Sequence, residues 1–249
     1  MKQTQGLRLW AVLFWLCVWQ LGSMALGSEL LLLSPLRVLQ RLGQLAMTEP
    51  FWQSVSFSLM HIAGGFLLAM CAGVVLAALS ARFRAVRELL APAMLTVKTV
   101  PVASFIILAL IWFSTKTLAV FISFLMVLPV IYTGTLGGIC AADRQLLEMA
   151  QVFAVPLGRR LRCVYLPQVM PQFRAACTVA LGLCWKAGVA AEVIGMPRGS
   201  VGERLQQAKV YLNTPDLFAW TLTVVLLSLM FERLFLALLR ALSARLERV

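Results

Sequence analysis

Residues 148–167 read EMAQVFAVPLGRRLRCVYLP and form the most basic interruption of an otherwise apolar chain. Arg159, Arg160 and Arg162 lie inside this stretch. An arginine at the centre of a bilayer costs about 2.5–3.5 kcal/mol on insertion scales, so a run of three does not lie in hydrocarbon. We therefore expect residues 141–168 to form a segment outside the membrane that joins two spans.

The composition around this segment is that of a membrane protein. Of 249 residues, 61% are hydrophobic and 13% are charged, whereas about 25% of a soluble domain is charged. Apolar runs of about 18 residues or more recur, which is the length needed to span a bilayer. They are continuous rather than alternating, which favours helices over a barrel. The fold class is therefore all-α, and residues 1–249 form one polytopic domain.

The apolar runs predict six transmembrane helices. A signal peptide ending near Ala25-Leu26-Gly27-Ser28 is the alternative for the first run, but its bulky tryptophans favour a retained span. Pro101 predicts a broken third span, with a second half over about 104–113, because proline removes a helix hydrogen bond. The six spans cover roughly residues 10–26, 52–79, 89–113, 118–140, 173–194 and 217–239.

The net charge of +12 is best explained by orientation in the membrane rather than by nucleic-acid binding. Most Lys and Arg lie on one side of the predicted spans, for example Arg82, Arg84 and Arg87. Cytoplasmic loops carry such an excess. The charge bias therefore places both termini and residues 141–168 in the cytoplasm.

The basic segment itself has a helix–turn–helix pattern. Asp143 can cap a helix over 144–154, Pro156-Leu157-Gly158 supplies a break, and a short helix over 159–164 leads to the next span at Leu166-Pro167. This pattern suits a protrusion that docks into a partner. Charge alone favours the alternative, an ordinary basic loop on the cytoplasmic side.

The spacing of the segment resembles the EAA motif of importer-type ABC transporter permeases. Glu148-Met149-Ala150 begins the pattern, and Leu166-Pro167 ends it. Met149 replaces the first alanine, and Ala154 stands where the family has glycine. The resemblance implies that Glu148, Met149, Ala150, Ala154, Pro156, Gly158, Leu166 and Pro167 contact an ATPase. Because Ala154 is not glycine, we expect the turn to be centred on Pro156 to Gly158 instead.

The resemblance extends to the nitrate/sulfonate/taurine branch over about residues 30–245. Pro101 followed by Trp112-Phe113, and Trp185 followed by Glu192 near Gly195, match its third and fifth spans. The branch implies a type I importer in a bacterial inner membrane. It also implies a second permease subunit forming a homodimer, two ATP-binding subunits and a solute-binding protein. This chain has no GxxxxGK[ST] phosphate loop, so the ATPase is expected on another polypeptide.

Three charged residues fall within predicted spans away from their cytoplasmic ends. Lys98 lies beside the Pro101 break, where irregular backbone can line a cavity, and Lys186 and Glu192 lie in the fifth span. Lys186 and Glu192 are about 240° apart around a helix and so face different ways. Lys98, Pro101, Lys186 and Glu192 are candidates for the translocation pathway. The alternative is a structural role, and Glu192 could instead bond to the loop that follows it.

Two other function classes remain open from the residues. An intramembrane hydrolase would use His61, the single histidine, as a base and Ser200 as a nucleophile, although His61 more simply suits a hydrogen-bonded core residue. An ion-coupled secondary transporter would favour internal repeats. The chain lacks the His, Asp and Glu clusters that hold a metal, and we expect no cofactor. The transported solute is not defined by the sequence.

Overall fold

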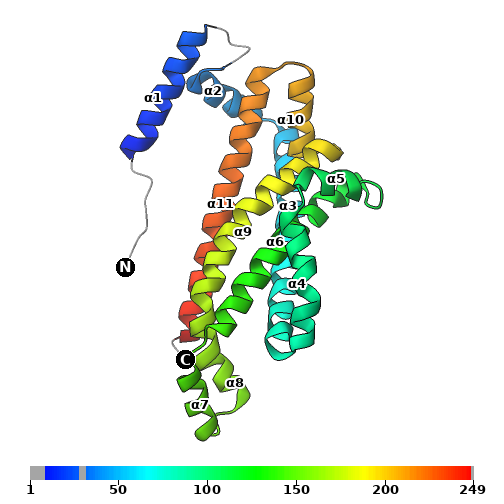
Figure 1. The fold of residues 1–249 in the computed structure, drawn as a ribbon. Helices are drawn as coiled ribbons and strands as arrows, with labels where there is room; N and C mark the ends of the chain where they lie inside the picture. Colours follow the sequence, from blue (N-terminus) through cyan, green and yellow to red (C-terminus); the bar gives the residue numbers. More distant parts are fainter. Residues whose placement is uncertain (1–8, 28–31, 248–249) are drawn as a thin grey trace.

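A computed structural model describes residues 9–27 and 32–247, and each of its regular elements is a helix. The expectations for the termini and for Ser28 lie outside the described residues. The elements are α1 (Leu9–Leu26), α2 (Pro35–Ala46), α3 (Glu49–Arg82), α4 (Arg84–Thr99), α5 (Val102–Ala109), α6 (Thr115–Cys140), α7 (Arg144–Val152), α8 (Leu157–Arg160), the π-helix η1 (Leu161–Tyr165), α9 (Leu166–Gly195), α10 (Val201–Val210) and α11 (Thr214–Glu247) (Figure 1).

Four helices in the described part of the chain are long and apolar enough to cross a membrane: those over 49–82, 115–140, 158–195 and 214–241. The bent pair α4 and α5 would make a fifth span. The apolar part of α1, Trp10–Ala25, is shorter than these four helices. The all-helical, multi-span fold is confirmed. The predicted number of six spans is not, because length and composition identify four spans, or five with the bent pair, among the described residues.

The core of the bundle lies where α6 packs between α3 and α9. Gly65 of α3 allows this approach, because a Cβ there would lie 2.5 Å from the carbonyl oxygen of Val120. Phe66, fully buried beside it, packs edge-on against Phe235 of α11 with ring centroids 4.9 Å apart. Close helix packing through small residues is the usual arrangement in membranes, where water does not drive helices together.

The third span is broken as Pro101 predicted, but the geometry is more extreme than a kink. Val100 is extended, with ψ 134°, and α4 and α5 meet at 103°. The second half is shorter than the expected 104–113, since α5 ends at Ala109. Ile106 and Ala109 of α5 are buried with Leu118 of α6 in one apolar cluster. This packing holds α5 across the bundle instead of along it.

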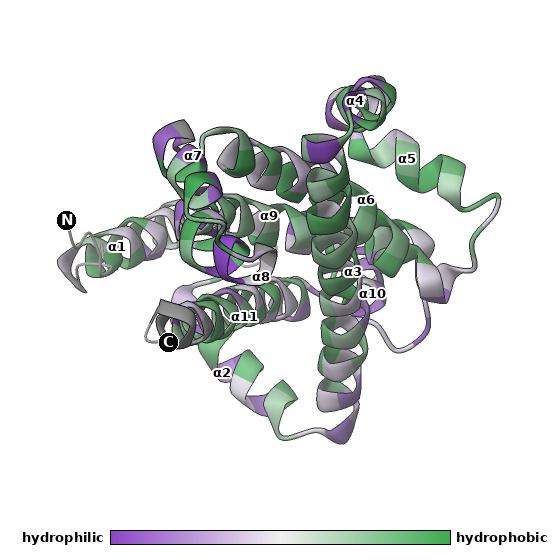
Figure 2. Cartoon of the chain, turned by 90° about the horizontal axis from the view of Figure 1, so that it is seen from below, coloured by the Kyte–Doolittle hydropathy of each residue, from purple (hydrophilic) through white to green (hydrophobic). Residues whose placement is uncertain are grey.

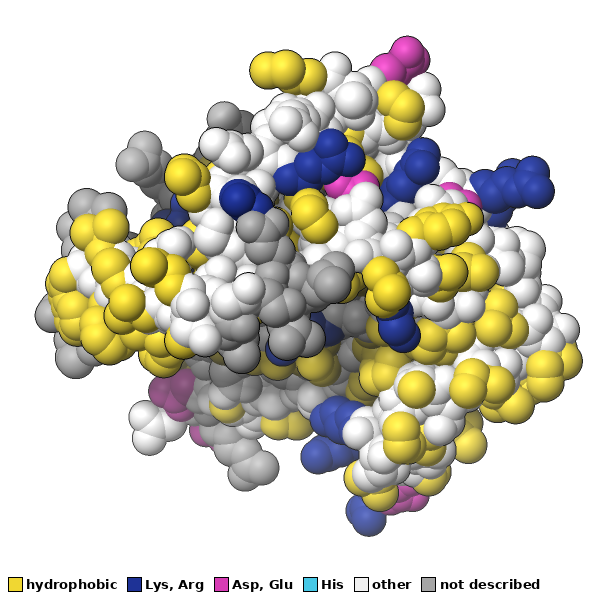
Figure 3. All heavy atoms as spheres, turned by 90° about the horizontal axis from the view of Figure 1, so that it is seen from above, with side chains coloured by type: hydrophobic (Ala, Val, Ile, Leu, Met, Phe, Trp, Pro, Cys, Tyr) yellow, Lys and Arg dark blue, Asp and Glu magenta, His cyan; other side chains and the backbone are white. Residues whose placement is uncertain are grey.

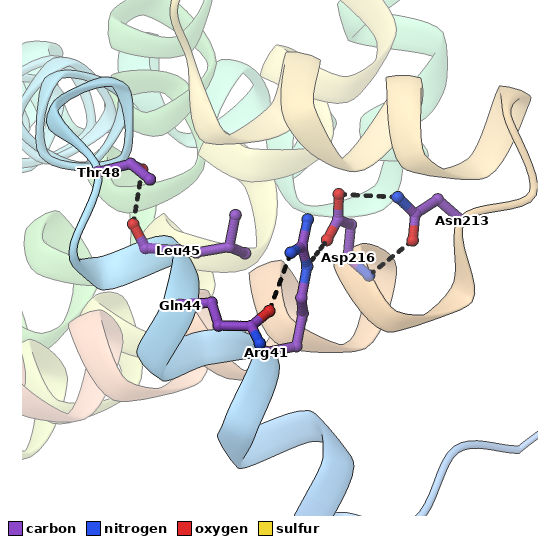
Figure 4. A network of polar contacts seen from close by, with 6 residues as sticks. All are labelled: Arg41, Gln44, Leu45, Thr48, Asn213 and Asp216. Atoms are coloured by element: carbon purple, nitrogen blue, oxygen red, sulfur yellow. Dashed lines mark hydrogen bonds and ion pairs between the residues drawn. The ribbon is translucent and has the colours of Figure 1, made fainter.

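At the end of the bundle away from α7 and α8, α2 and the start of α11 are joined by a polar network (Figure 4). The Nε of Arg41 pairs with Oδ1 of Asp216, and Asn213 donates to Oδ2 of Asp216 at 2.9 Å. The hydrogen bond that Arg41 donates to Asp216 raises the pKa of Arg41 above its already high ordinary value, so the pair stays ionised. Figure 3 shows cationic side chains among apolar ones on this face.

The helix α10 lies between the fifth and sixth predicted spans, where no helix was predicted. Ser200 caps it by accepting a hydrogen bond from the backbone N–H of Glu203 at 3.0 Å. The carboxylate of Glu203 accepts from the backbone N–H of Gly199 at 2.6 Å. A serine followed three residues later by glutamate is a helix-start pattern, so the sequence contained this signal.

At the opposite end, α7 and α8 protrude beyond the spans beside the last turns of α11 (Figure 1). Figure 2 shows hydrophilic residues concentrated on α7 and α8 in this view, while the spans behind them are largely hydrophobic. The basic segment and the carboxyl end of α11 therefore share one side of the bundle.

Candidate functional site

The segment over 141–168 begins with a capped helix. The Asp143 carboxylate accepts a hydrogen bond from the backbone N–H of Gln145 at 2.8 Å, which confirms the expected cap of α7. The side-chain oxygen of Gln168, in the first turn of α9, accepts from the backbone N–H of Asp143 at 2.6 Å. The start of α7 is thereby tied to the start of a membrane-spanning helix.

One face of α7 is apolar and exposed. Leu146 and Met149 lie one turn apart on it, and Val152 and Phe153 extend it with exposed fractions of 82% and 74%. Glu148 is exposed beside this face, whereas Ala150 points into the subunit and is buried. Exposed apolar side chains rimmed by polar ones mark protein interaction sites. The protrusion thus has the surface of a docking element.

The turn after α7 lies at Ala154, and the expectation that it is centred on Pro156 to Gly158 is wrong. Ala154 has φ 50°, in the left-handed region. Its N–H bonds to the carbonyl of Gln151, and the N–H of Val155 bonds to that of Ala150, both at 3.0 Å. This is the Schellman helix ending, which normally places glycine at the left-handed position. Gly158 has no positive φ and lies inside α8.

This geometry predicts the effect of substitutions at Ala154. A non-glycine residue in the left-handed region costs about 1–2 kcal/mol, partly offset by the greater freedom of glycine when unfolded. We expect Ala154→Gly to slow hydrogen exchange at the Val155 amide several-fold. We expect Ala154→Val, whose branched Cβ fits this region poorly, to accelerate it. Hydrogen-exchange mass spectrometry measures both.

Gly158→Ala is the matched control, because a Cβ there meets nothing within 4 Å and the backbone is helical. It should leave exchange at Val155 unchanged. If the Val155 amide exchanged faster in Gly158→Ala and at the wild-type rate in Ala154→Gly, the turn would be centred on Pro156 to Gly158 after all.

The segment runs into the next span without interruption. A short helix was expected over 159–164; α8 covers Leu157–Arg160, and η1 follows immediately over Leu161–Tyr165. Leu166 and Pro167 then begin α9, and Pro167 has no N–H with which to continue the helix hydrogen bonds to the preceding turn. A π-helix inside a longer helix is rare and is frequently found at functional sites.

The four in-span candidates lie in different environments. Lys98 is exposed at the end of α4, and its Nζ donates to the hydroxyl of Thr133 on α6 at 3.3 Å. Lys98 and Thr133 line a groove of about 240 Å³ between α4 and α6. Thr133 was not foreseen from the sequence. Pro101 lies at the bend that ends this groove's α4 wall.

Lys186 is exposed on α9, although the residues on either side of it, Trp185 and Ala187, are buried. Gly182, one turn earlier, has open space around the position of a Cβ. Within the described part of the chain no hydrogen bond or ion pair involves the Lys186 ammonium. A cation at this depth normally faces protein or water rather than lipid, so this face of α9 suits a pathway or a second subunit.

Glu192 is fully buried near the carboxyl end of α9, so it does not share the open face of Lys186. Its Oε2 accepts a hydrogen bond from the Ser58 hydroxyl of α3 at 2.6 Å and one from the Gly202 N–H of α10 at 3.1 Å. The Ser58 oxygen accepts in turn from the Val201 N–H at 2.9 Å. Of the two roles foreseen for Glu192, the geometry matches bonding to the loop that follows it.

This network fixes α10 against the bundle. Gly202 is required for the close approach of α10 to α9, because a Cβ at this position would lie 2.3 Å from the Cβ of Glu192. Oε1 of Glu192 is buried without a hydrogen-bond partner among the described residues. Ser58 was missed from the sequence; the available signal was a pair of serines, Ser54 and Ser58, one turn apart at the start of an apolar helix.

The two residues of the alternative hydrolase each make a local structural hydrogen bond. Ser200 is the buried N-cap of α10 and bonds to Glu203. His61 stacks on Phe57, and its Nδ1 lies 2.7 Å from the carbonyl oxygen of the same residue. His61 thus has the local hydrogen bond expected of a structural histidine.

Comparison with known proteins gives one family match and several relatives. Residues 69–248 match the model of the family described as binding-protein-dependent transport system inner membrane component. The chain is 26% identical over 231 residues to the taurine transport system permease protein of Escherichia coli (strain K12), covering 90% of this chain and 84% of that protein.

Two further relatives belong to the same branch. A putative aliphatic sulfonates transport permease protein of Bacillus subtilis (strain 168) is 27% identical, with 86% of this chain and 78% of that protein covered. The nitrate import permease protein of Synechococcus elongatus is 27% identical, with 72% and 68% covered. The chain therefore belongs to the binding-protein-dependent inner membrane component family, as a multi-pass permease subunit of the ABC transporter class and not an enzyme.

Proposed function

We propose that this chain forms the translocation pathway of an ATP-driven importer and docks a separate ATPase through residues 141–168. The observation that supports this most is the exposed apolar face of α7 beside Glu148. In water such a face costs free energy until a partner covers it. The bond between Gln168 and Asp143 offers a route for that partner to move α9.

The assembly we propose contains two copies of the permease chain as a homodimer and two ATP-binding subunits. A solute-binding protein completes it at the opposite side. The termini and α7 lie in the cytoplasm in this arrangement, in line with the excess of Lys and Arg at that end. The outer end, with α2, α10 and the Arg41–Asp216 network, then faces the solute-binding protein.

We propose that the solute is small and carries an anionic group. Lys98 and Lys186 are both exposed, and neither ammonium has an acidic partner among the described residues. Cations at membrane depth mark ion and substrate pathways. Relatives named for taurine, aliphatic sulfonates and nitrate support the same class.

Neutralising either lysine tests the pathway assignment. We expect Lys98→Met and Lys186→Met each to raise the KM for uptake by about tenfold. Loss of one charged contact with the solute weakens binding by roughly 1.4 kcal/mol, which corresponds to a tenfold change in affinity. Amounts of assembled complex should not change. Uptake of radiolabelled solute into proteoliposomes gives both quantities.

Lys116→Met is the control, because Lys116 is an equally exposed lysine in the first turn of α6, away from the α4–α6 groove. It should keep the wild-type KM. A wild-type KM in both Lys98→Met and Lys186→Met would make the two lysines structural.

The proposal as a whole is tested by reconstitution. The chain, its ATPase and its solute-binding protein are placed in proteoliposomes, and thermal shifts of the binding protein with taurine, alkanesulfonates and nitrate identify the solute. We expect uptake that requires ATP and all three components. Uptake driven by an ion gradient without the ATPase would support a secondary transporter instead.

A further inference from the structure

An apolar groove of about 480 Å³ lies at the inner end of the bundle, away from the candidate pathway residues. Its walls come from the last turns of α3, from α6 and from the junction of η1 with α9. Small side chains leave the space open, notably Ala78 and Ala81 of α3. The lining residues are Val74, Ala78, Ala81, Arg82, Thr135, Ile139, Leu161, Tyr165, Leu166 and Val169.

The charged and aromatic polar side chains of this groove lie at the ends of its helices. Arg82 ends α3 and Tyr165 ends η1, whereas Val74 and Ile139 are apolar. From Val74 to Arg82 the helix rises about 12 Å, most of one leaflet of a ~30 Å hydrocarbon core. Arginine and tyrosine are typical of the headgroup level of a membrane. The groove therefore runs from headgroup level into the hydrocarbon of the inner leaflet.

Thr135 supplies a second, independent observation. Its hydroxyl is buried in the groove wall and has no hydrogen-bond partner among the described residues. The nearby Thr133 instead donates to the carbonyl oxygen of Pro129 at 2.7 Å, as threonine in a helix usually does. A buried hydroxyl without a partner is costly, so the groove suits a ligand with an acceptor oxygen at this depth.

From these features we propose that the groove binds one anionic phospholipid of the inner leaflet. An acyl chain lies along Val74 and Ala78, an ester oxygen accepts from Thr135, and the phosphate faces Arg82. Charge complementarity favours an anionic headgroup, because Arg82 lines the groove and has no carboxylate partner among the residues described, whereas Arg84, outside the lining, pairs with Glu88. Basic pockets between spans on the cytoplasmic side bind such headgroups.

The position of the groove links the lipid to the docking segment. Leu161 and Tyr165 form one wall, and both belong to the π-helix that joins α8 to α9. A lipid in the groove supports this irregular helix from the membrane side. The binding proposal itself does not depend on transport, so its test reads lipid rather than activity.

The test uses the purified chain in nanodiscs of equal dioleoyl-phosphatidylglycerol and dioleoyl-phosphatidylcholine, with native mass spectrometry of retained lipid. We expect the wild type to retain phosphatidylglycerol about fivefold over phosphatidylcholine. Arg82→Gln should remove the preference but keep a bound lipid, and Ala78→Phe should remove the bound lipid. The controls Arg84→Gln and Leu79→Phe, on the same inner surface but outside the groove lining, should resemble the wild type.

A photo-crosslinking amino acid at Ala78 identifies the occupant without relying on the stability of Ala78→Phe. A phospholipid adduct supports the proposal. An adduct with a second copy of the chain or with the ATPase overturns it, as does an unchanged lipid ratio in Arg82→Gln.

Discussion

Replacing Glu148 by arginine is expected to abolish solute-stimulated ATP hydrolysis while leaving the chain folded and inserted. Glu148 is exposed beside the apolar face of α7, and no described residue pairs with it. Its loss therefore does not disturb the subunit. Reversal of a charge at a docking surface produces like-charge contact with a partner adapted to a carboxylate, which costs several kcal/mol and reduces binding by several orders of magnitude.

The measurement is ATP hydrolysis by the reconstituted complex with and without loaded solute-binding protein. Glu88→Arg is the matched control, because Glu88 is an exposed carboxylate near the same end of the bundle, in α4 and outside the segment. We expect stimulation to persist in Glu88→Arg. Full stimulation in Glu148→Arg would remove Glu148 from the docking surface.

Adding a methyl group at Gly202 is expected to be the most destabilising small substitution at the outer end. In Gly202→Ala the new Cβ would lie 2.3 Å from the Cβ and 2.6 Å from the carbonyl carbon of Glu192. Because one obstacle is backbone, α10 must move away from α9, and the hydrogen bonds to Glu192 and Ser58 are lost. Overpacking and buried unpaired groups together cost about 3 kcal/mol or more.

Thermal unfolding of the purified chain in detergent should show a Tm lowered by several degrees for Gly202→Ala. Gly43→Ala is the control, because Gly43 lies in α2 with open space around its Cβ position. It should keep or slightly raise the Tm. Equal Tm values for Gly202→Ala and the wild type would contradict the close packing of α10 on Glu192.

The parts of the fold that follow local rules were predictable from the sequence. Pro101 has no backbone N–H and constrains Val100, so the break in the third span follows from two residues. Asp143 ahead of an amphipathic run gave the cap of α7 in the same way. The direction of α5 was not predictable, because the 103° bend depends on the burial of Ile106 and Ala109 against α6.

In the candidate site, too, local features were predictable and contacts between distant residues were not. The register of Glu148 through Pro167 is visible in the sequence, but the turn was misplaced because alanine is an unfavourable residue for the left-handed region. In Ala154 the hydrogen bonds of the helix ending overcome that local preference. The contact of Glu192 with Ser58 joins residues far apart in the chain, and no local pattern indicates which helix supplies the partner.

The central claim is that α7 docks the ATPase, and site-specific photo-crosslinking from Val152 tests it most directly. Val152 is 82% exposed on the apolar face of α7, so a benzophenone amino acid there does not disturb the subunit. Val210, exposed at the carboxyl end of α10 on the opposite side of the bundle, is the control position. The account predicts a covalent adduct with the ATPase subunit from Val152 and none from Val210. Adducts from Val152 with lipid alone, in a complex that contains the ATPase, would contradict it.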